Sequence, residues 1–142
     1  MQKAFVFSGI ILMLFSSCKK EEAFISPECR NPVIYQKFDN ARALVIGVLD
    51  ARLNDYANTG HCDNCYDTEL ILANQEVYSI GELYEQTSTC YNVYHLYQSY
   101  CYKMITGSQF ISNQTDSAEL AVQKLKYEAQ FGRILNYVKS LQ

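Results

Sequence analysis

The sequence predicts an all-α protein, an up-and-down bundle of three or four helices stabilised by disulfides. Apolar residues recur at helical spacing through most of the chain beyond residue 30. No stretch there alternates apolar and polar residues between turn signals, as a half-buried strand would. Six cysteines are available to cross-link a chain of 142 residues. Short connections would make neighbouring helices antiparallel, so that each buries its apolar stripe in one core.

The first 22 residues have the pattern of an export signal. Lys3 precedes a largely apolar run over residues 4–15, and small residues then lead to Cys18. An apolar run of about a dozen residues is too short for a membrane span, which needs about 20. We therefore expect residues 1–17 to be a signal peptide, residues 18–30 an N-terminal tether and residues 31–142 a single helical domain.

The end of this segment, Leu14-Phe15-Ser16-Ser17-Cys18, resembles the lipobox of bacterial lipoproteins, with Phe15 where leucine is usual. The resemblance implies that Cys18 becomes the acylated N-terminus, carrying palmitate-type chains that anchor the protein to a membrane. Residues 19–22, Lys-Lys-Glu-Glu, resemble the surface-export signal of Bacteroidetes lipoproteins and lack the aspartate that retains lipoproteins at the inner membrane. This implies an outer-membrane location and leaves surface exposure open. The alternative is that residues 19–22 are only a solvated linker.

The first expected helix begins at Asn31 and Pro32. Asn31 suits the N-cap, and Pro32 suits the first helical position, where its missing N–H costs no hydrogen bond. Gly60 is expected to end the helix in the left-handed conformation. The stripe that recurs at helical spacing comprises Ile34, Phe38, Ala41, Val45, Val48 and Arg52, widened by Leu44, Leu49 and Leu53.

A polar loop, residues 61–65, precedes the next helical pattern, which begins at Tyr66. Ser79 and Glu82 have the spacing of a capping box, which would open a separate helix, but they can also lie inside one long helix. The pattern continues to Met104, and residues 106–108 are expected to break it.

The last helix is expected to follow a loop over residues 110–115. Asp116 and Glu119 form a second candidate capping box. The expected apolar positions are Ala121, Val122, Leu125, Ala129, Gly132, Leu135 and Val138, with Phe131, Ile134 and Leu141 beside them.

Charge argues against a nucleic-acid partner. Lys3 would leave with the signal, which takes the twelve basic residues to eleven against fifteen acidic ones, a formal net charge of −4. No segment clusters lysine and arginine with interleaved aromatic residues, as binding to a phosphate backbone requires.

Five cysteines remain if Cys18 carries lipid, so at least one is unpaired within the chain. Cys90 and Cys101 are eleven residues apart on one helix, about 16 Å by helical rise, which is too far for a bridge. A turn near Ser79 would favour bridges from Cys62 and Cys65 to Cys90 and Cys101. One long helix would instead place Cys29 near Cys90. We favour the turn.

Two chemical alternatives centre on His61, Cys62 and Cys65. A Cys-x-x-Cys pair at a helix N-terminus can be redox-active, and these three residues with Cys90 or His95 could supply zinc ligands. Exported cysteines are more often bridged than metallated. No catalytic motif is present, so we expect no cofactor, no metal and no enzyme activity.

Tyrosine is unusually abundant, with twelve in the chain, and it crowds one segment. A row of tyrosine rings is suited to a partner protein or a sugar, although the rings can also simply complete the core. The candidate contact residues are Tyr91, Tyr94, Tyr97 and Tyr100. We expect a membrane-anchored envelope lipoprotein that acts as a protein-interaction module, of accessory or immunity type. The alternative is a thiol-redox or metal-binding envelope protein.

Overall fold

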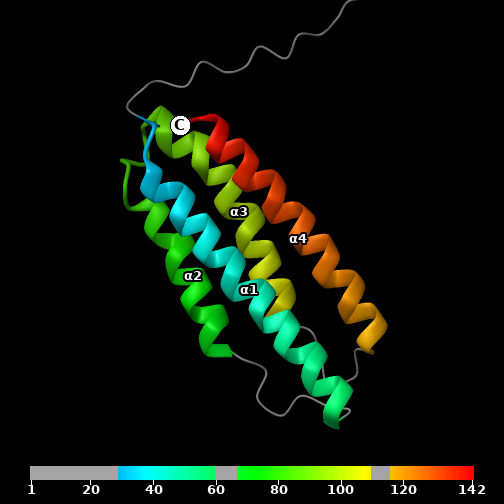
Figure 1. The fold of residues 1–142 in the computed structure, drawn as a ribbon. Coiled ribbons are helices and arrows are strands. Elements are labelled where there is room, and N and C mark those ends of the chain that lie inside the picture. The colour runs from blue at the N-terminus through cyan, green and yellow to red at the C-terminus, as the bar shows by residue number, and fades with distance from the viewer. Residues whose placement is uncertain (1–28, 60–66, 110–115) are drawn as a thin grey trace, which may run out of the picture.

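The computed structural model describes residues 29–59, 67–109 and 116–142, and these ranges form four α-helices without a strand. The helices are α1 (Pro32–Thr59), α2 (Asp67–Gly81), α3 (Thr89–Gln109) and α4 (Ser117–Ser140). Figure 1 shows them side by side along most of their length. The prediction of an all-α bundle of three or four helices is confirmed, with four.

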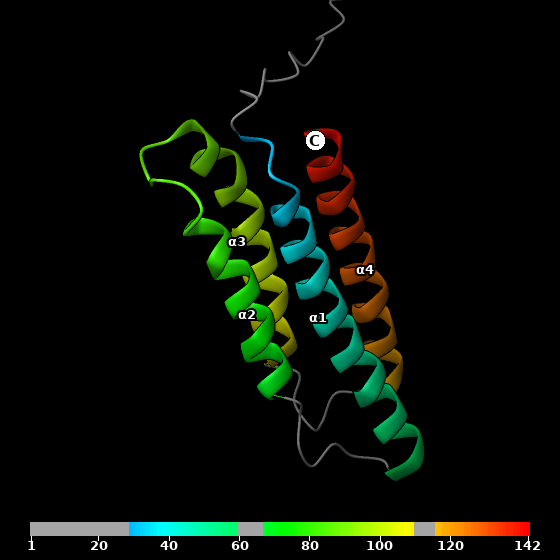
Figure 2. The same cartoon turned by 60° about the vertical axis from the view of Figure 1, so that its left-hand side comes forward.

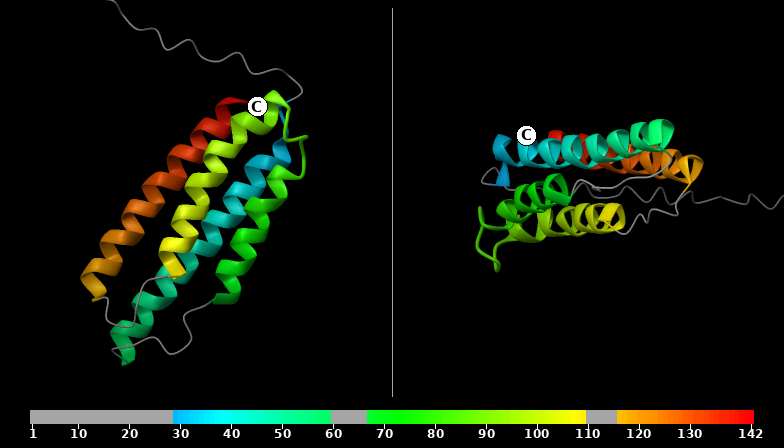
Figure 3. Two further views of the ribbon diagram at one scale, coloured as in Figure 1. Left: turned by 180° about the vertical axis from the view of Figure 1, so that it is seen from behind. Right: turned by 90° about the horizontal axis from the view of Figure 1, so that it is seen from below.

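Consecutive helices run antiparallel, so that the start of α1, the turn between α2 and α3 and the C-terminus meet at one end (Figure 2). Seen from below, α1 lies beside α4 in one layer, and α2 lies beside α3 in the other (Figure 3, right). α1 packs against both α2 and α4, and α2 packs against α3, whereas α3 and α4 touch only lightly. One long edge of the bundle is therefore loosely closed.

The start and the core face of α1 agree with the sequence prediction. The Asn31 side chain accepts a hydrogen bond from the Val33 backbone N–H at 3.0 Å, and Pro32 is the first helical residue. The predicted stripe is buried, including Arg52, whose Nη1 donates to the carbonyl oxygen of Ser108 near the end of α3. An arginine in that position satisfies a carbonyl of the last helical turn, which would otherwise lack a partner.

The turn between α2 and α3 exists, but it does not start at Ser79. Ser79 lies inside α2, and its hydroxyl donates to the carbonyl oxygen of Glu76 at 2.8 Å, so the capping-box prediction there is wrong. The buried apolar positions of α2 continue to Ile80, which keeps the helix intact past the serine. Ser88 caps α3 instead, because its Oγ accepts the Tyr91 backbone N–H at 3.1 Å.

The predicted break over residues 106–108 is also wrong, since α3 continues to Gln109. The Ser108 hydroxyl donates to the Met104 carbonyl oxygen at 2.9 Å within the helix. Gly107 has a packing role: a β-carbon at this position would overlap the hydroxyl oxygen of Tyr127 on α4. The glycine therefore makes room for the tip of the Tyr127 side chain, and it does not terminate α3.

We expect Gly107→Ala to lower the free energy of unfolding by about 1–2 kcal/mol. Overpacking costs about 1–3 kcal/mol, which outweighs the gain of up to about 1 kcal/mol from better helix propensity. In a Tyr127→Phe background the hydroxyl is gone, and the same substitution should cost nothing. Gly47→Ala is the matched control, because no atom lies within 4 Å of a β-carbon built there and the change should stabilise. Urea unfolding is measured for the wild type and the four variants, Tyr127→Phe alone included; equal effects at Gly107 and Gly47 would contradict the packing role.

The start of α4 is confirmed, and so is the burial of the predicted Phe131, Ile134, Leu135 and Val138, but the core face predicted for the first half of the helix is wrong. Asp116 is the N-cap, and its carboxylate accepts the Glu119 backbone N–H at 2.7 Å. Val122 and Leu125, which we expected in the core, are each 66% exposed. The residues that α4 buries are Leu120, Tyr127, Phe131, Ile134, Leu135 and Val138.

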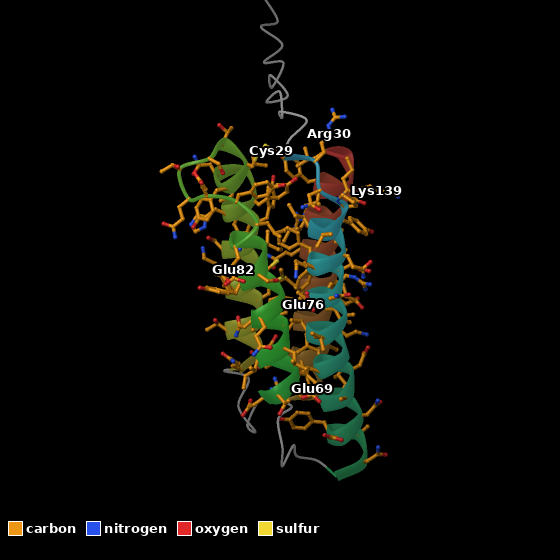
Figure 4. The ribbon with its side chains drawn as sticks, turned by 90° about the vertical axis from the view of Figure 1, so that its left-hand side faces the viewer. Cys29, Arg30, Glu69, Glu76, Glu82 and Lys139 are labelled. Carbon is orange, nitrogen blue, oxygen red and sulfur yellow. A yellow bond between two sulfur atoms is a disulfide. The ribbon has the colours of Figure 1, made fainter. Side chains whose placement is uncertain are left out.

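A disulfide joins Cys29 to Cys90, with 5.0 Å between their α-carbons, so the pairing expected for a turn is wrong. The turn brings the start of α3 to the end of the bundle where α1 begins, which puts Cys90 beside Cys29 (Figure 4). Cys101 is a buried free thiol, which corrects its role as a disulfide candidate, and burial raises its pKa to about 12. Cys62 and Cys65 lie outside the described residues.

Candidate functional site

A cleft opens along the edge where α3 and α4 touch only lightly. Its volume is about 390 Å³, within the usual range for ligand sites. It spans about two turns of each helix. The residues lining it are Tyr97, Tyr100 and Lys103 from α3, with Gln130, Arg133, Ile134 and Tyr137 from α4.

Three tyrosine rings give the cleft an ordered aromatic surface. Tyr97 and Tyr137 stack across the two helices, with ring centroids 4.6 Å apart and an interplanar angle of 28°. Tyr100 meets Tyr97 edge to face at 6.4 Å. Ile134, which also lines the cleft, is buried, whereas Tyr100 remains 46% exposed. Stacked rings lose little conformational freedom on binding, so this surface is already organised for a ligand.

Two cations flank these rings. The Lys103 ammonium lies 5.9 Å from the centroid of the Tyr100 ring, and Arg133 is exposed on α4. Neither forms an ion pair with another residue in the part of the chain that the structure describes. α3 and α4 together carry five basic and two acidic residues, although the whole chain has a formal charge of −3. The cleft is therefore a positive, aromatic surface on a negative protein.

The Tyr97 phenol stays neutral far above physiological pH. Burial first, and then the nearby Tyr137 and Tyr100 phenols, raise the pKa of Tyr97 to about 12. Burial likewise raises the pKa of Tyr94, an α3 residue in the core of the bundle, to about 12. The Tyr97 hydroxyl therefore stays protonated, and a hydrogen bond with the Tyr137 hydroxyl contributes to the raised pKa.

These shifts predict an alkaline loss of stability. Unfolded tyrosine has a pKa of about 10, below the folded values, so the stabilisation is complete below about pH 10 and declines as the pH rises toward 12. Urea unfolding at about pH 9 and about pH 11 should show the decline. Tyr97→Phe should make it shallower, because one such group is removed. An equally steep decline in the variant would contradict the assignment to Tyr97.

The four predicted tyrosines do not act as one row. Tyr97 and Tyr100 line the cleft, and Tyr91 lies on the opposite side of α3. Tyr94 is buried, and its hydroxyl donates to the Cys29 carbonyl oxygen at 2.6 Å, so its predicted role in partner contact is wrong. Rings at three-residue spacing rotate around the helix, which distributes them over different faces.

Sequence reasoning missed the α4 half of the cleft. Its members, at positions 130, 133, 134 and 137, recur at spacings of three and four and so share one side of the helix. This spacing could have flagged the face as a unit. It could not have shown that the face lies opposite Tyr97.

The structure does not describe the three residues of the predicted thiol and metal site. His61, Cys62 and Cys65 lie outside the described residues, and so does the predicted lipidation residue Cys18. Cys90 is bridged to Cys29 and cannot be the fourth zinc ligand. His95 stacks on Tyr91 at 5.1 Å. Within the described ranges, no group of three His, Cys, Asp or Glu residues is placed to hold a metal ion.

No protein family, curated protein or solved structure matches this chain. Among helices α1 to α4, none is long and apolar enough to cross a bilayer. The features that bear on function are therefore the chemistry of the cleft and the N-terminal sequence pattern.

Proposed function

We propose that this protein is an envelope lipoprotein, anchored through Cys18, that binds a partner protein in the α3–α4 cleft. The observation that carries the proposal is the cleft itself, with its Tyr97–Tyr137 stack, exposed Tyr100 and two cations that form no ion pair with the described residues. Tyrosine and arginine are over-represented among the residues that dominate binding energy at protein interfaces. The partner surface is expected to be acidic, because complementary charge speeds encounter and fixes orientation.

The position of the cleft is compatible with a lipid anchor. The tether would enter the domain at Cys29, which is bonded to Cys90 at the start of α3. Tyr97 lies eight residues after Thr89, about 12 Å farther along α3. An extended tether over residues 19–28 spans at most about 35 Å. A domain held at its Cys29 end would thus present the cleft on its side, clear of the membrane surface.

Site-specific photo-crosslinking tests the interaction. A benzophenone amino acid at Tyr100 should give one discrete adduct in the cells that make this protein. The same probe at Val33, on α1, should give none, although the two positions are 46% and 47% exposed. Lys103→Glu with Arg133→Glu should abolish the adduct.

A charge-matched variant separates local from general effects. Arg30→Glu with Lys139→Glu removes two exposed cations near the Cys29 end of the bundle and should leave the adduct unchanged (Figure 4). Loss of the adduct in both double variants, or its persistence in both, would contradict binding through the cleft.

Metabolic labelling with an alkyne analogue of palmitate tests the anchor separately. Label should enter the wild-type chain, and separation of the membranes should place the chain in the outer-membrane fraction. Cys18→Ala should block labelling and release the protein from membranes, since two or more acyl chains are what give stable anchorage. The double variant Cys29→Ala, Cys90→Ala should still be labelled. Labelling that survives Cys18→Ala would show that another residue is acylated.

A further inference from the structure

A second aromatic surface lies on the outer side of α2 and α3, away from the cleft. Two adjoining hollows, each of about 640 Å³, share Tyr78, Glu82 and Tyr102. One extends along α2 to Ile71, and the other extends past Glu85 to the face of α3 that carries Tyr91. We call this continuous surface the α2–α3 groove. It is defined by Ile71, Tyr78, Glu82, Glu85, Tyr91 and Tyr102.

Tyrosine rings gather at the centre of the groove. Tyr78 is 64% exposed, although it is a large aromatic residue. Tyr102 lies close to both Tyr78 and Tyr91, and this proximity adds to burial in raising the pKa of its phenol. Tyr91 is stacked on His95, which restrains its ring. Neutral tyrosine rings around an open hollow attract organic cations through their π faces.

The charge of the groove is opposite to that of the cleft. Residues 67–88 contain five acidic residues and no lysine or arginine. Figure 4 shows Glu69, Glu76 and Glu82 following one another along α2 toward the Cys29 end. Glu76 pairs with Lys37 at 3.8 Å, whereas Glu82 and Glu85 are exposed and form no ion pair with the described residues. Two carboxylates are therefore available beside the tyrosine rings.

The length of the groove favours an extended cationic polypeptide over a small ammonium ion. Ile71 and Glu82 are eleven residues apart, about 16 Å along the helix, which is the span of about five residues of extended polypeptide. Ile71, at one end, is 51% exposed and offers an apolar contact. A small ammonium ion would cover only the tyrosine cluster and would leave Ile71 in water.

We propose that the α2–α3 groove binds a basic polypeptide segment in which lysine or arginine alternates with apolar side chains. The cationic groups contact Glu82, Glu85 and the tyrosine rings, and an apolar side chain covers Ile71. This site is independent of the α3–α4 cleft. The domain then carries two binding surfaces of opposite charge on different sides.

The test uses the full chain purified in detergent and calorimetric titration with an acetylated, amidated octapeptide, Gly-Lys-Leu-Lys-Gly-Arg-Leu-Gly. Binding should be detectable and should weaken with added salt. Glu82→Gln with Glu85→Gln should lower the affinity about tenfold, because two ion pairs are lost. Tyr78→Ala should also lower it several-fold. Backbone amide NMR shifts caused by the peptide should cluster on α2 and the start of α3.

The control variant is Asp50→Asn with Glu128→Gln, which removes two carboxylates that contact Lys124 on the α1–α4 side. Its affinity should stay within twofold of wild type. Equal binding of a peptide with glutamate in place of each basic residue would overturn the proposal, as would shifts centred on the α3–α4 cleft. Binding of tetramethylammonium or spermidine as tight as that of the peptide would replace the polypeptide with a small cation.

Discussion

Replacing both Cys29 and Cys90 with alanine is expected to lower the free energy of unfolding by about 4 kcal/mol. The bridge closes a chain segment with a sequence separation of 61 residues. In the chain-entropy description, a loop of that length restricts the unfolded ensemble by about 4 kcal/mol. Since domains of this size are stable by about 5–15 kcal/mol, the loss would leave a marginal fold.

Urea unfolding followed by circular dichroism measures the loss. A reductant should destabilise the wild-type chain by a similar amount, whereas the double variant has no Cys29–Cys90 bond to lose. Any further effect of reductant on the variant would report on other sulfurs, Cys62 and Cys65 among them. A fall of less than about 1 kcal/mol in the variant would contradict the assigned constraint.

The bridge belongs to a larger set of contacts that fixes one end of the bundle. The Tyr84 and Tyr94 hydroxyls donate to the Cys29 carbonyl oxygen at 3.2 and 2.6 Å. The Gln142 side chain donates to the Asn31 carbonyl oxygen at 3.2 Å, which connects the C-terminus to the same end of the bundle. A lipid tether entering at Cys29 would therefore transmit force directly to α3, the helix that both proposed binding surfaces share.

The sequence predicted correctly those helix starts that depend only on interactions between residues close together in the chain. Asn31 and Asp116 cap their helices as expected, because an N-cap needs only a side-chain oxygen and nearby backbone N–H groups. The cap predicted at Ser79 is wrong because its spacing is only a local signal, which packing overrode. Ser79 has the spacing of a cap, but the apolar contacts of Val77 and Ile80 continue the helix through it, and Ser88 provides the cap instead.

Features made by distant residues could not be predicted. Tyr97 and Tyr137 stack although forty residues separate them in the sequence, and neither residue's neighbours encode that contact. The disulfide is a similar case: Cys29 was expected near Cys90 only if one long helix formed, whereas the turn, which is present, was expected to pair Cys90 with Cys62 or Cys65. The pairing depends on which ends of the bundle meet, and that is decided by the packing of all four helices.

The core face was mispredicted in the first half of α4 because that part of the helix has two apolar stripes. One contains Val122, Leu125 and Ala129, and the other contains Leu120, Tyr127 and Phe131. Both have helical spacing, so periodicity alone gives no preference. The buried stripe has two aromatic rings, each of which removes about 150–250 Å² of surface from water, more than valine or alanine can. The larger burial decides the orientation of the helix.

Two identical substitutions on α4 test that orientation. Leu120→Ala should lower the free energy of unfolding by about 2–5 kcal/mol, because Leu120 is 0% exposed and its loss leaves a cavity. Leu125→Ala, five residues later and 66% exposed, should change it by no more than about 0.5 kcal/mol. Leucine and alanine are both good helix formers, so propensity adds little to either value. Urea unfolding of both variants decides the question. The reverse order of effects would mean that α4 buries its Val122 and Leu125 stripe, and the α3–α4 cleft would then not exist in this form.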